Sequence, residues 1–451
     1  MVLPTRNRPL LRQGTGPSIQ SPTVFRSWYS AAACLCLMGL AFLFHGCERR
    51  EIVRPTPQMD VESQFWVRVR LLADVSECDL EIPSAFRVVR PETGGGRHVE
   101  QSLMQSPATV ATARMVDGRL LLGTTPLADS EVVIGPERPH IFRLNGHGYR
   151  GKLKLIVDRG GQTFDVINLV PLEPYLAGVV GAEMPDYWEP QALQAQAIAA
   201  RTYCLYIKNR FGVNRSYDVS RTQASQVYNG IRAESAQVWN AVNNTYGKIL
   251  VTDQSRSGSR VSLNPLDRGL FPAYYSSVCG GHTADSEKTF GDSFGTLRGV
   301  PCPYCKDVAK LGLFFWPMVQ FDRETVTNQL LARYPSLKPL GKIKDIVVTE
   351  KSNYGKFARL TGIKLVGETG RTDTLRGEDL RLAIDPTGRR IKSTICLIAP
   401  WGNGWAFLSG RGWGHGVGMC QCGAEGMARR GSSAEAILQY YYPGCEIVSV
   451  Y

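Results

Sequence analysis

Apolar and polar residues alternate in short runs through the first third of this 451-residue chain. Segments such as FWVRVRLLADV and TFDVINLV are rich in β-branched residues and are separated by Gly, Pro and Asp. Period-two alternation bounded by turn-forming residues is typical of strands. The pattern therefore predicts an antiparallel, β-rich region from about residue 63 to 170.

The pattern then changes to that of helices. The segment WEPQALQAQAIAARTYCLYIKNRFG places Pro190 at a first helical position and Gly212 at a stop, with good helix formers between them. A second helix is predicted within 234–247, which ends in glycine. In this reading Glu183 lies on the connection between a strand-like apolar run and the helix that starts at Pro190.

Strands and helices alternate over the rest of the chain. KILVTD and AYYSSV read as strands, RETVTNQLLARYP as a helix, and the segment from IKDIVV to LVGETG as a β-hairpin. Past residue 400 a glycine-rich loop leads into two helices. No repeat has a fixed period, so the sequence predicts an α+β fold with helices inserted among antiparallel strands.

The N-terminus predicts export. An apolar run from Trp28 to Phe44 follows several arginines, which is the pattern of a secretory signal or a short membrane anchor over residues 1–47. Cys47 after Gly46 also suggests lipoprotein processing, although Phe44 stands where that pattern has Leu. A buried core helix is a weaker interpretation because the run is not amphipathic. The charged, proline-containing residues 48–62 read as a linker.

The formal net charge of +12 allows more than one class of partner. Nucleic acid is one, but the sequence shows no basic helix, zinc-finger array or aromatic nucleic-acid motif. An exported chain more often meets an anionic cell envelope. We therefore expect no nucleic-acid partner, and a weak attraction to the envelope.

Two residue pairs have the spacing of a metal site. Cys279-Gly-Gly-His282 is followed downstream by Cys302-Pro-Tyr-Cys305. Two intervening residues let one tight turn aim both ligands at one ion, so these four residues predict a tetrahedral zinc site. Four protein ligands leave no open position, which makes the predicted role structural. The alternatives are disulfides or buried thiols.

A second, poorer cluster is His415 with Cys420 and Cys422. This spacing matches no common metal-site geometry, so packing or a disulfide to Cys396 or Cys445 is the alternative to metal binding.

Glu183 is the candidate for acid–base chemistry. It is surrounded in sequence by apolar residues, which would remove water from its carboxylate and raise its pKa, as a general acid for glycosidic cleavage requires. An isolated glutamate is more often a solvated surface residue, so this signal is weak by itself.

The case for Glu183 is strengthened by four motifs that occur in the order found in a known family. VPLEPYLAGVVGAEMP, ALQAQAIAARTY, AYYSSVCGGHTADSE and GRGWGHGVGMCQCGAEGMARRG resemble those of the SpoIID/LytB family, which comprises sporulation stage II protein D and the amidase enhancers. The resemblance covers about residues 135 to 451 as a catalytic domain, and leaves 63–134 as a β-rich accessory region.

The resemblance implies a lytic transglycosylase of the bacterial cell wall. It implies that Glu183 protonates the glycosidic oxygen between N-acetylmuramic acid and N-acetylglucosamine, then acts as a base on the muramic C6 hydroxyl, which closes onto C1. Family motifs place further residues at the substrate, with a structural salt bridge as the alternative for the arginine. These expected substrate-binding residues are Arg201, Gln194, Ser276, Ser277 and His415.

Three departures from the family's pattern bear on this expectation. Gln194 stands in place of a lysine, Tyr275 in place of a histidine, and MCQCGA in place of MSQYGA. The loss of the lysine puts substrate affinity in doubt. The loss of the histidine leaves the zinc prediction on the two spaced pairs.

Three functions therefore compete. The first is an envelope-anchored lytic transglycosylase acting on peptidoglycan glycan strands. The second is a wall-binding module without catalysis that stimulates a cell-wall amidase, as the enhancer branch of the family suggests. The third is a hydrolase that leaves reducing muramic ends.

Overall fold

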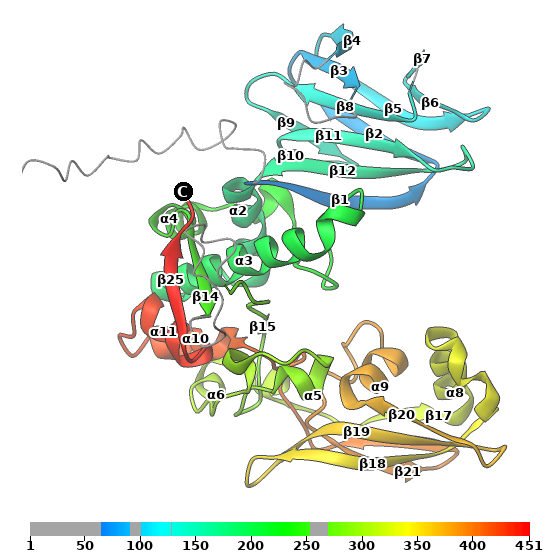
Figure 1. Cartoon of the computed structure of the whole chain (residues 1–451), viewed down its shortest axis with the longest axis vertical. Helices are drawn as coiled ribbons and strands as arrows, with labels where there is room; N and C mark the ends of the chain where they lie inside the picture. The colour runs from blue at the N-terminus through cyan, green and yellow to red at the C-terminus, as the bar shows by residue number, and fades with distance from the viewer. Residues whose placement is uncertain (1–64, 91–100, 128, 253–268) are drawn as a thin grey trace, which may run out of the picture. The chain divides into compact units, whose positions relative to one another are not determined.

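The computed structural model describes residues 65–90, 101–127, 129–252 and 269–451 (Figure 1). Helices and antiparallel sheets are mixed along this part of the chain, which confirms the α+β prediction. The expectations for the signal or anchor, for Cys47 and for the linker lie outside the described residues. Within the described ranges, no helix combines the length and the apolarity needed to cross a bilayer.

Strands β1 to β12 confirm the predicted β-rich region. They form most of a seven-stranded sheet, ordered β13-β1-β12-β11-β8-β3-β4, and all of a six-stranded sheet, ordered β10-β9-β2-β5-β6-β7. Their bounds are β1 Trp66–Val75, β2 Glu77–Ile82, β3 Phe86–Arg90, β4 Gln101–Ser106, β5 Thr109–Val116, β6 Arg119–Leu122, β7 Thr125–Pro126, β8 Glu131–Pro136, β9 Ile141–Leu144, β10 His147–Arg150, β11 Lys152–Val157 and β12 Phe164–Pro171.

The alternation in β1 explains why these strands form a half-buried sheet. Val67, Val69 and Leu71 are buried, whereas the residues between them are partly exposed. Apolar side chains of both sheets belong to one buried cluster. The expected boundary at residue 134 falls inside β8, and the same sheet continues through β11 and β12 to Pro171.

The segment after β12 differs from the prediction. Residues Leu172–Glu183 form helix α2 instead of a connection. Residues 172–180 are all buried, so the segment has no polar face and no amphipathic period to read. Helix α3, Pro190–Phe211, agrees with the prediction: Pro190 opens it and Gly212 caps its C-terminus.

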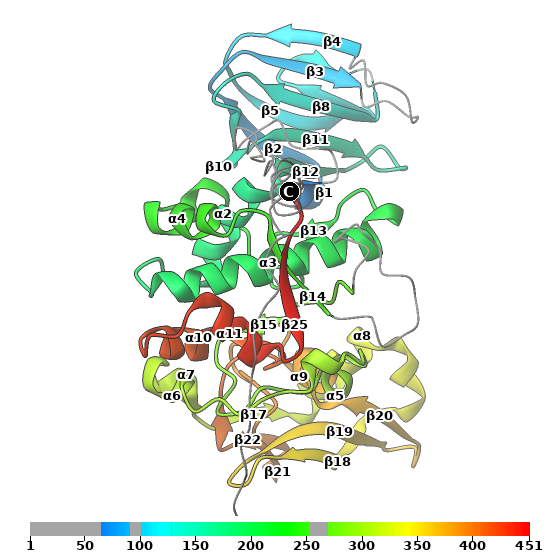
Figure 2. The same ribbon diagram turned by 60° about the vertical axis from the view of Figure 1, so that its left-hand side comes forward.

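Helices from the C-terminal end of the sequence pack against α3. Figure 2 shows α10 (Gln421–Ala428) and α11 (Ala434–Tyr441) beside it. Two short sheets also link strands that follow α3 in the sequence to strands near its C-terminal end. Strand β14 pairs antiparallel with β25, and β15 pairs parallel with β24. The remaining elements of this part are β13 Val219–Ser220, α4 Ala236–Asn244, β14 Lys248–Thr252, β15 Tyr275–Ser276, α5 Ser286–Phe290, α6 Cys305–Val308, α7 Leu311–Phe314, β24 Met419–Cys420 and β25 Cys445–Ser449, with 3₁₀ turns at Gly212–Asn214, Gly230–Ala233 and Gly295–Leu297.

A second buried cluster lies within residues 316–407. It is covered by two three-stranded sheets, ordered β17-β22-β21 and β18-β19-β20, and it includes the predicted helix and hairpin. The elements of this segment and its edges are β16 Phe315–Trp316, β17 Val319–Asp322, α8 Arg323–Arg333, a 3₁₀ helix Pro335–Leu340, β18 Ile343–Asn353, β19 Ala358–Gly367, β20 Thr372–Arg376, α9 Gly377–Ile384, β21 Leu397–Trp401, β22 Gly404–Leu408 and β23 Gly410–Arg411.

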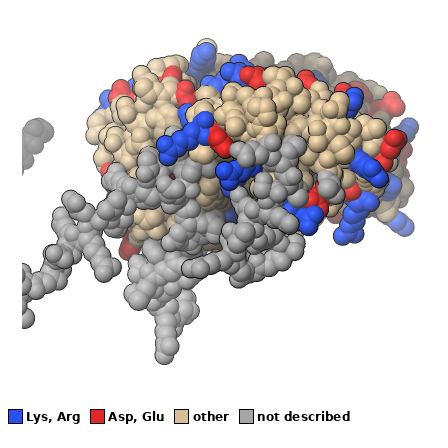
Figure 3. All heavy atoms as spheres, turned by 90° about the horizontal axis from the view of Figure 1, so that it is seen from above, with Lys and Arg blue, Asp and Glu red and all other residues tan. Residues whose placement is uncertain are grey.

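Basic and acidic side chains are interspersed on the face of the described residues seen in Figure 3.

Candidate active site and four-cysteine centre

Glu183 is the last residue of α2, and its carboxylate accepts hydrogen bonds from two distant segments. The backbone N–H of Val227 donates to Oε1 at 2.8 Å. The side-chain amide of Gln421 donates to Oε2 at 3.3 Å. No basic side chain of the described residues forms an ion pair with this carboxylate. In the part of the chain that the structure describes, the hydrogen-bond donors to the candidate acid are therefore both neutral.

Burial raises the pKa of the Glu183 carboxyl above its ordinary value of 4.5, because the charged form loses hydration. The hydrogen bonds from Val227 and Gln421 stabilise the charged form and offset only part of this effect. The C-terminus of α2 acts in the same direction as burial, since its unpaired carbonyls carry partial negative charge. A carboxyl in this environment keeps its proton closer to neutral pH, as a general acid must.

Two glycines bring the end of α2 against the segment that carries Val227. A Cβ at Gly178 would lie 2.5 Å from a ring carbon of Tyr228, and one at Gly181 would lie 1.9 Å from the carbonyl oxygen of Ala233. No side chain fits at these distances. The glycines therefore allow the close approach that lets Val227 reach the carboxylate.

Tyr275 lies near Glu183, at the start of β15. Burial, and next the negative charge of Glu183, raise the pKa of its hydroxyl. The hydroxyl oxygen accepts a hydrogen bond from Nε2 of Gln226 at 2.9 Å, and Oε1 of the same glutamine accepts one from Tyr175 at 3.0 Å. The tyrosine that replaces the family's histidine therefore remains protonated beside the candidate acid.

Arg201 does not lie at the site as a sugar ligand. Its side chain is fully buried, and its guanidinium forms a bidentate pair with Glu173, with N···O distances of 2.8 and 2.6 Å. Its third nitrogen donates to the carbonyl oxygen of Lys248 at 2.8 Å. A guanidinium without solvent access and with each nitrogen engaged favours the structural salt bridge, which was the alternative interpretation of Arg201.

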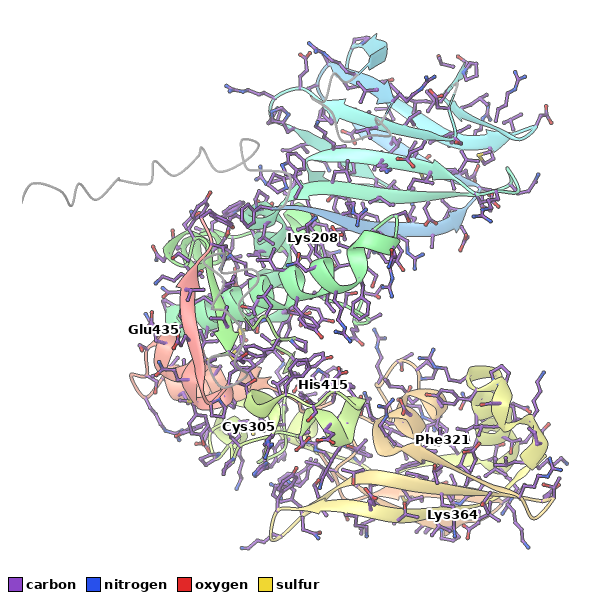
Figure 4. All side chains as sticks on the ribbon, viewed as in Figure 1. Lys208, Cys305, Phe321, Lys364, His415 and Glu435 are labelled. Atoms are coloured by element: carbon purple, nitrogen blue, oxygen red, sulfur yellow. The ribbon has the colours of Figure 1, made fainter. Side chains whose placement is uncertain are left out.

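Four buried cysteines form a compact centre. The sulfur atoms of Cys279, Cys302, Cys305 and Cys420 all lie within 4.8 Å of one another, and the Cys279 and Cys305 sulfurs are 3.7 Å apart. A tetrahedral ion with zinc–sulfur bonds of about 2.3 Å requires sulfur atoms roughly 3.8 Å apart. The donor set and its spacing therefore fit a tetrathiolate metal site. Figure 4 marks Cys305, at the start of α6.

This centre corrects the predicted ligand set at one position. His282 is not part of the group: its Nδ1 lies 2.7 Å from the carbonyl oxygen of Thr283, and its ring stacks on Tyr354 with centroids 4.0 Å apart. Cys420 is the fourth cysteine instead. The parallel pairing of β15 with β24 brings Cys420 beside Ser276, a contact that sequence spacing does not reveal.

The other expected cysteine pairings are not formed. Cys396, Cys420, Cys422 and Cys445 are all free thiols, as are the remaining cysteines of the described residues. The predicted second cluster therefore separates: Cys420 joins the four-cysteine centre, and Cys422 stays outside it.

The expected substrate residues occupy different environments. Ser276 is buried and its hydroxyl has no partner among the described residues, whereas Ser277 and Gln194 are partly exposed. His415 (Figure 4) lies in the glycine-rich loop against Tyr274 and Phe290. Burial lowers the pKa of its imidazole to about 4, so the ring is neutral at physiological pH.

Sequence reasoning missed Gln421 and the backbone N–H of Val227. Gln421 stands inside the motif MCQCGA, but only the cysteines of that motif were singled out. Its position directly after a cysteine and at the start of a helix was the available signal. A backbone donor such as Val227 leaves no signal in residue identity.

Comparison with known proteins identifies the family. Residues 160–251 match a family model, SpoIID, described as stage II sporulation protein. An uncharacterised protein of Brachyspira hyodysenteriae is 32% identical over 375 residues, which span 82% of this chain and 91% of that protein. The chain belongs to the SpoIID/LytB family.

Two relatives with descriptive names support this membership. Stage II sporulation protein D of Bacillus subtilis is 28% identical over 291 residues, 62% of this chain and 75% of that protein. The amidase enhancer of Bacillus subtilis is 26% identical over 373 residues, 74% of this chain and 49% of that protein.

Proposed function

We propose that this protein is a peptidoglycan lytic transglycosylase with Glu183 as its general acid and base. The observation that carries the proposal is the state of this carboxyl: it is partly buried, it accepts hydrogen bonds from the neutral donors Val227 and Gln421, and its pKa is raised. Arg201 and Glu173 form a buried ion pair, and the proposal gives them no part in the reaction. Family membership supports a role in the cell wall.

The proposed reaction needs one carboxyl group. Protonated Glu183 gives its proton to the glycosidic oxygen between N-acetylmuramic acid and N-acetylglucosamine, and the bond from that oxygen to C1 of the muramic residue breaks. The carboxylate then takes the proton of the muramic C6 hydroxyl while O6 bonds to C1. No water is consumed, and a 1,6-anhydro end forms. The substrate supplies its own nucleophile, unlike in hydrolases that use two carboxylates.

Zinc is the metal that we propose for the four-cysteine centre, which consists of Cys279, Cys302, Cys305 and Cys420. Four thiolates complete a tetrahedral shell and leave no position for water or substrate. Bound there, the ion would supply crosslinking of three chain segments, and no step of the proposed reaction passes through it.

The wider placement of the chain is also a proposal. Residues 1–47 would serve as a signal peptide, lipoprotein signal or membrane anchor, and 48–62 as a linker, so that the enzyme acts on glycan strands in the bacterial envelope. The β-rich region before the catalytic part has no assigned role in this proposal.

A second function has its own support. The relative named amidase enhancer matches 74% of this chain, so stimulation of a cell-wall amidase, with glycan binding but no cleavage, is the alternative proposal. It differs from the first in making no use of the carboxyl at Glu183.

The experiment that separates the two uses purified peptidoglycan, with and without stem peptides. The protein without residues 1–47 and its Glu183→Gln variant are incubated with each substrate, and the fragments are identified by mass spectrometry. Anhydro ends from the unsubstituted protein alone support the first proposal. Binding without cleavage, together with faster release of stem peptides when an amidase is added, supports the second.

A further inference from the structure

Helix α10 lies between Glu183 and the four-cysteine centre, and each of its two faces contacts one of them. Gln421 and Glu425 are four residues apart and share one face. Gly423 and Gly426 are three residues apart and share the opposite face, because successive residues of a helix are rotated by about 100°.

The first face reaches both ends of the Glu183 loop, which we define as residues 184–189, between α2 and α3. Gln421 is buried and donates to Oε2 of Glu183 at 3.3 Å. Glu425 is also buried, and its Oε2 accepts a hydrogen bond from the backbone N–H of Glu189 at 2.9 Å. One face of α10 therefore fixes the residue before the loop and the residue that ends it.

The opposite face packs on the turn that carries two of the cysteines. A Cβ at Gly423 would lie 2.6 Å from the sulfur of Cys302, and one at Gly426 would lie 2.8 Å from the carbonyl oxygen of Tyr304. These distances leave no space for a side chain. The backbone of α10 therefore lies directly on the cysteine turn, and its position follows the position of that turn.

The start of α10 is also joined to the centre. Cys420 precedes the helix as its N-cap residue, and its sulfur accepts a hydrogen bond from the backbone N–H of Cys279 at 3.2 Å. A metal bound to the four sulfur atoms would thus fix both the first turn of α10 and the surface beneath it.

We propose that α10 couples the four-cysteine centre to the Glu183 loop, and that Gln421 is a positioning residue for Glu183. This inference rests on the proposed role of Glu183 where activity is concerned, but its structural part does not. A metal ion in the centre keeps α10 in place, and α10 keeps the carboxyl and its loop in one arrangement.

The first test is Gln421→Met, which keeps the length of the side chain and removes its amide. We expect unchanged zinc content, a kcat lower by about tenfold or more with a smaller change in KM, and an alkaline limb of the pH profile moved to higher pH, because a donor to the charged carboxylate is lost. The matched control is Gln320→Met, an exposed glutamine on β17. A kcat and pH profile equal to those of the control would overturn the proposal.

The second test is Cys305→Ser, with Cys396→Ser as the control at a buried free thiol outside the centre. We expect loss of bound zinc and faster hydrogen exchange at the Glu189 amide, which donates to α10, with no change in α8. If Cys305→Ser does not fold, the same exchange is measured on the unsubstituted protein before and after chelation of zinc. Loss of zinc with unchanged protection of Glu189 would contradict the coupling.

These readouts also separate this inference from the proposed activity. If the protein cleaves no glycan, NMR titration of the Glu183 carboxyl and hydrogen exchange still report on the contact with α10. A carboxyl that titrates alike in Gln421→Met and in the unsubstituted protein overturns the positioning role, whether or not cleavage is seen.

Discussion

Each end of α2 carries a glutamate, and the two carboxylates have different partners and exposure: Glu173 is buried, whereas Glu183 is only partly buried. Glu173, in the first turn, meets the guanidinium of Arg201 in a bidentate pair and also accepts a hydrogen bond from Tyr451. Glu183, at the last position, accepts hydrogen bonds from an amide and a backbone N–H among the described residues. The carboxylate of Glu173 forms an ion pair that holds α2 against α3, whereas burial raises the pKa of the Glu183 carboxyl, which suits it to give up and take back a proton.

Helix polarity adds to this difference. A carboxylate in the first turn faces the positive end of the helix dipole, and one at the last position faces the negative end. The same residue type in one helix therefore serves the fold at one end and is suited to acid–base chemistry at the other. The predictions below test each half of this comparison.

The largest expected effect is a loss of stability when the ion pair between Glu173 and Arg201 is broken. Arg201→Met leaves Glu173 buried without its cation, so we expect the free energy of unfolding to fall by about 3–5 kcal/mol. The control is Arg143→Met, which removes an exposed pair with Glu81 and should cost about 1 kcal/mol or less. Urea unfolding monitored by circular dichroism measures both. Equal losses for the two variants would refute a closed structural role for Arg201.

The next effect concerns the approach of α2 to the segment that carries Val227. Gly181→Ala places a Cβ 1.9 Å from the carbonyl oxygen of Ala233, and overpacking of this kind costs about 1–3 kcal/mol. We also expect lower activity, because the end of α2 must move away from Val227. Gly312→Ala, where an added Cβ meets nothing within 4 Å, is the control. A variant as stable and active as that control would show that the close approach is dispensable.

A smaller effect, an increase in stability, is expected when Glu183 at the C-terminal end of α2 is replaced. The pKa of Glu183 is raised in the folded protein, so its contribution to stability is present when the group is protonated and is lost as pH rises through the folded pKa. Glu183→Gln should therefore raise the free energy of unfolding by about 1 kcal/mol at pH 7, and the gain should disappear below the ordinary pKa of 4.5.

Thermal unfolding at both pH values measures this change, with Glu350→Gln on the exposed surface of β18 as the control. A destabilised Glu183→Gln variant at pH 7 would show that the carboxylate, once charged, is held more favourably than its burial indicates.

The pH dependence of cleavage follows from the same pKa. The general acid must be protonated, so kcat/KM should fall as pH rises through the raised pKa of Glu183, at a pH above 4.5. The fall in kcat/KM is measured from the initial rates at which anhydro ends are released across this pH range. A limb at the ordinary pKa of a solvated glutamate would contradict the account of the site.

Helices and strands whose apolar residues recur at a regular period can be predicted from the sequence. An element without such a period is missed. Helix α3 is read correctly because Pro190 and Gly212 mark its ends, and β1 because its valines alternate with arginines. Helix α2 is missed because its first nine residues are buried on every side. An element without a polar face gives no periodic signal.

The site shows the same limit. Glu183 can be selected from its apolar surroundings and from the family motif, and three of the four cysteines can be selected from their spacing. Cys420 in place of His282, and Gln421 beside the carboxylate, depend on pairing between strands and helices that are far apart in sequence. For Arg201 the sequence leaves a substrate ligand and a structural salt bridge open, and the buried pair with Glu173, which favours the second, is a contact that the sequence does not reveal.

Whether the carboxyl of Glu183 performs the proposed chemistry can be decided from the chain ends that the protein produces. Purified peptidoglycan strands are incubated with the protein lacking residues 1–47 or with its Glu183→Gln variant, and the reducing and anhydro ends are counted by mass spectrometry. We expect 1,6-anhydromuramic ends from the unsubstituted protein and none from the folded variant. Equal amounts of anhydro ends from both proteins would contradict the proposed role of Glu183.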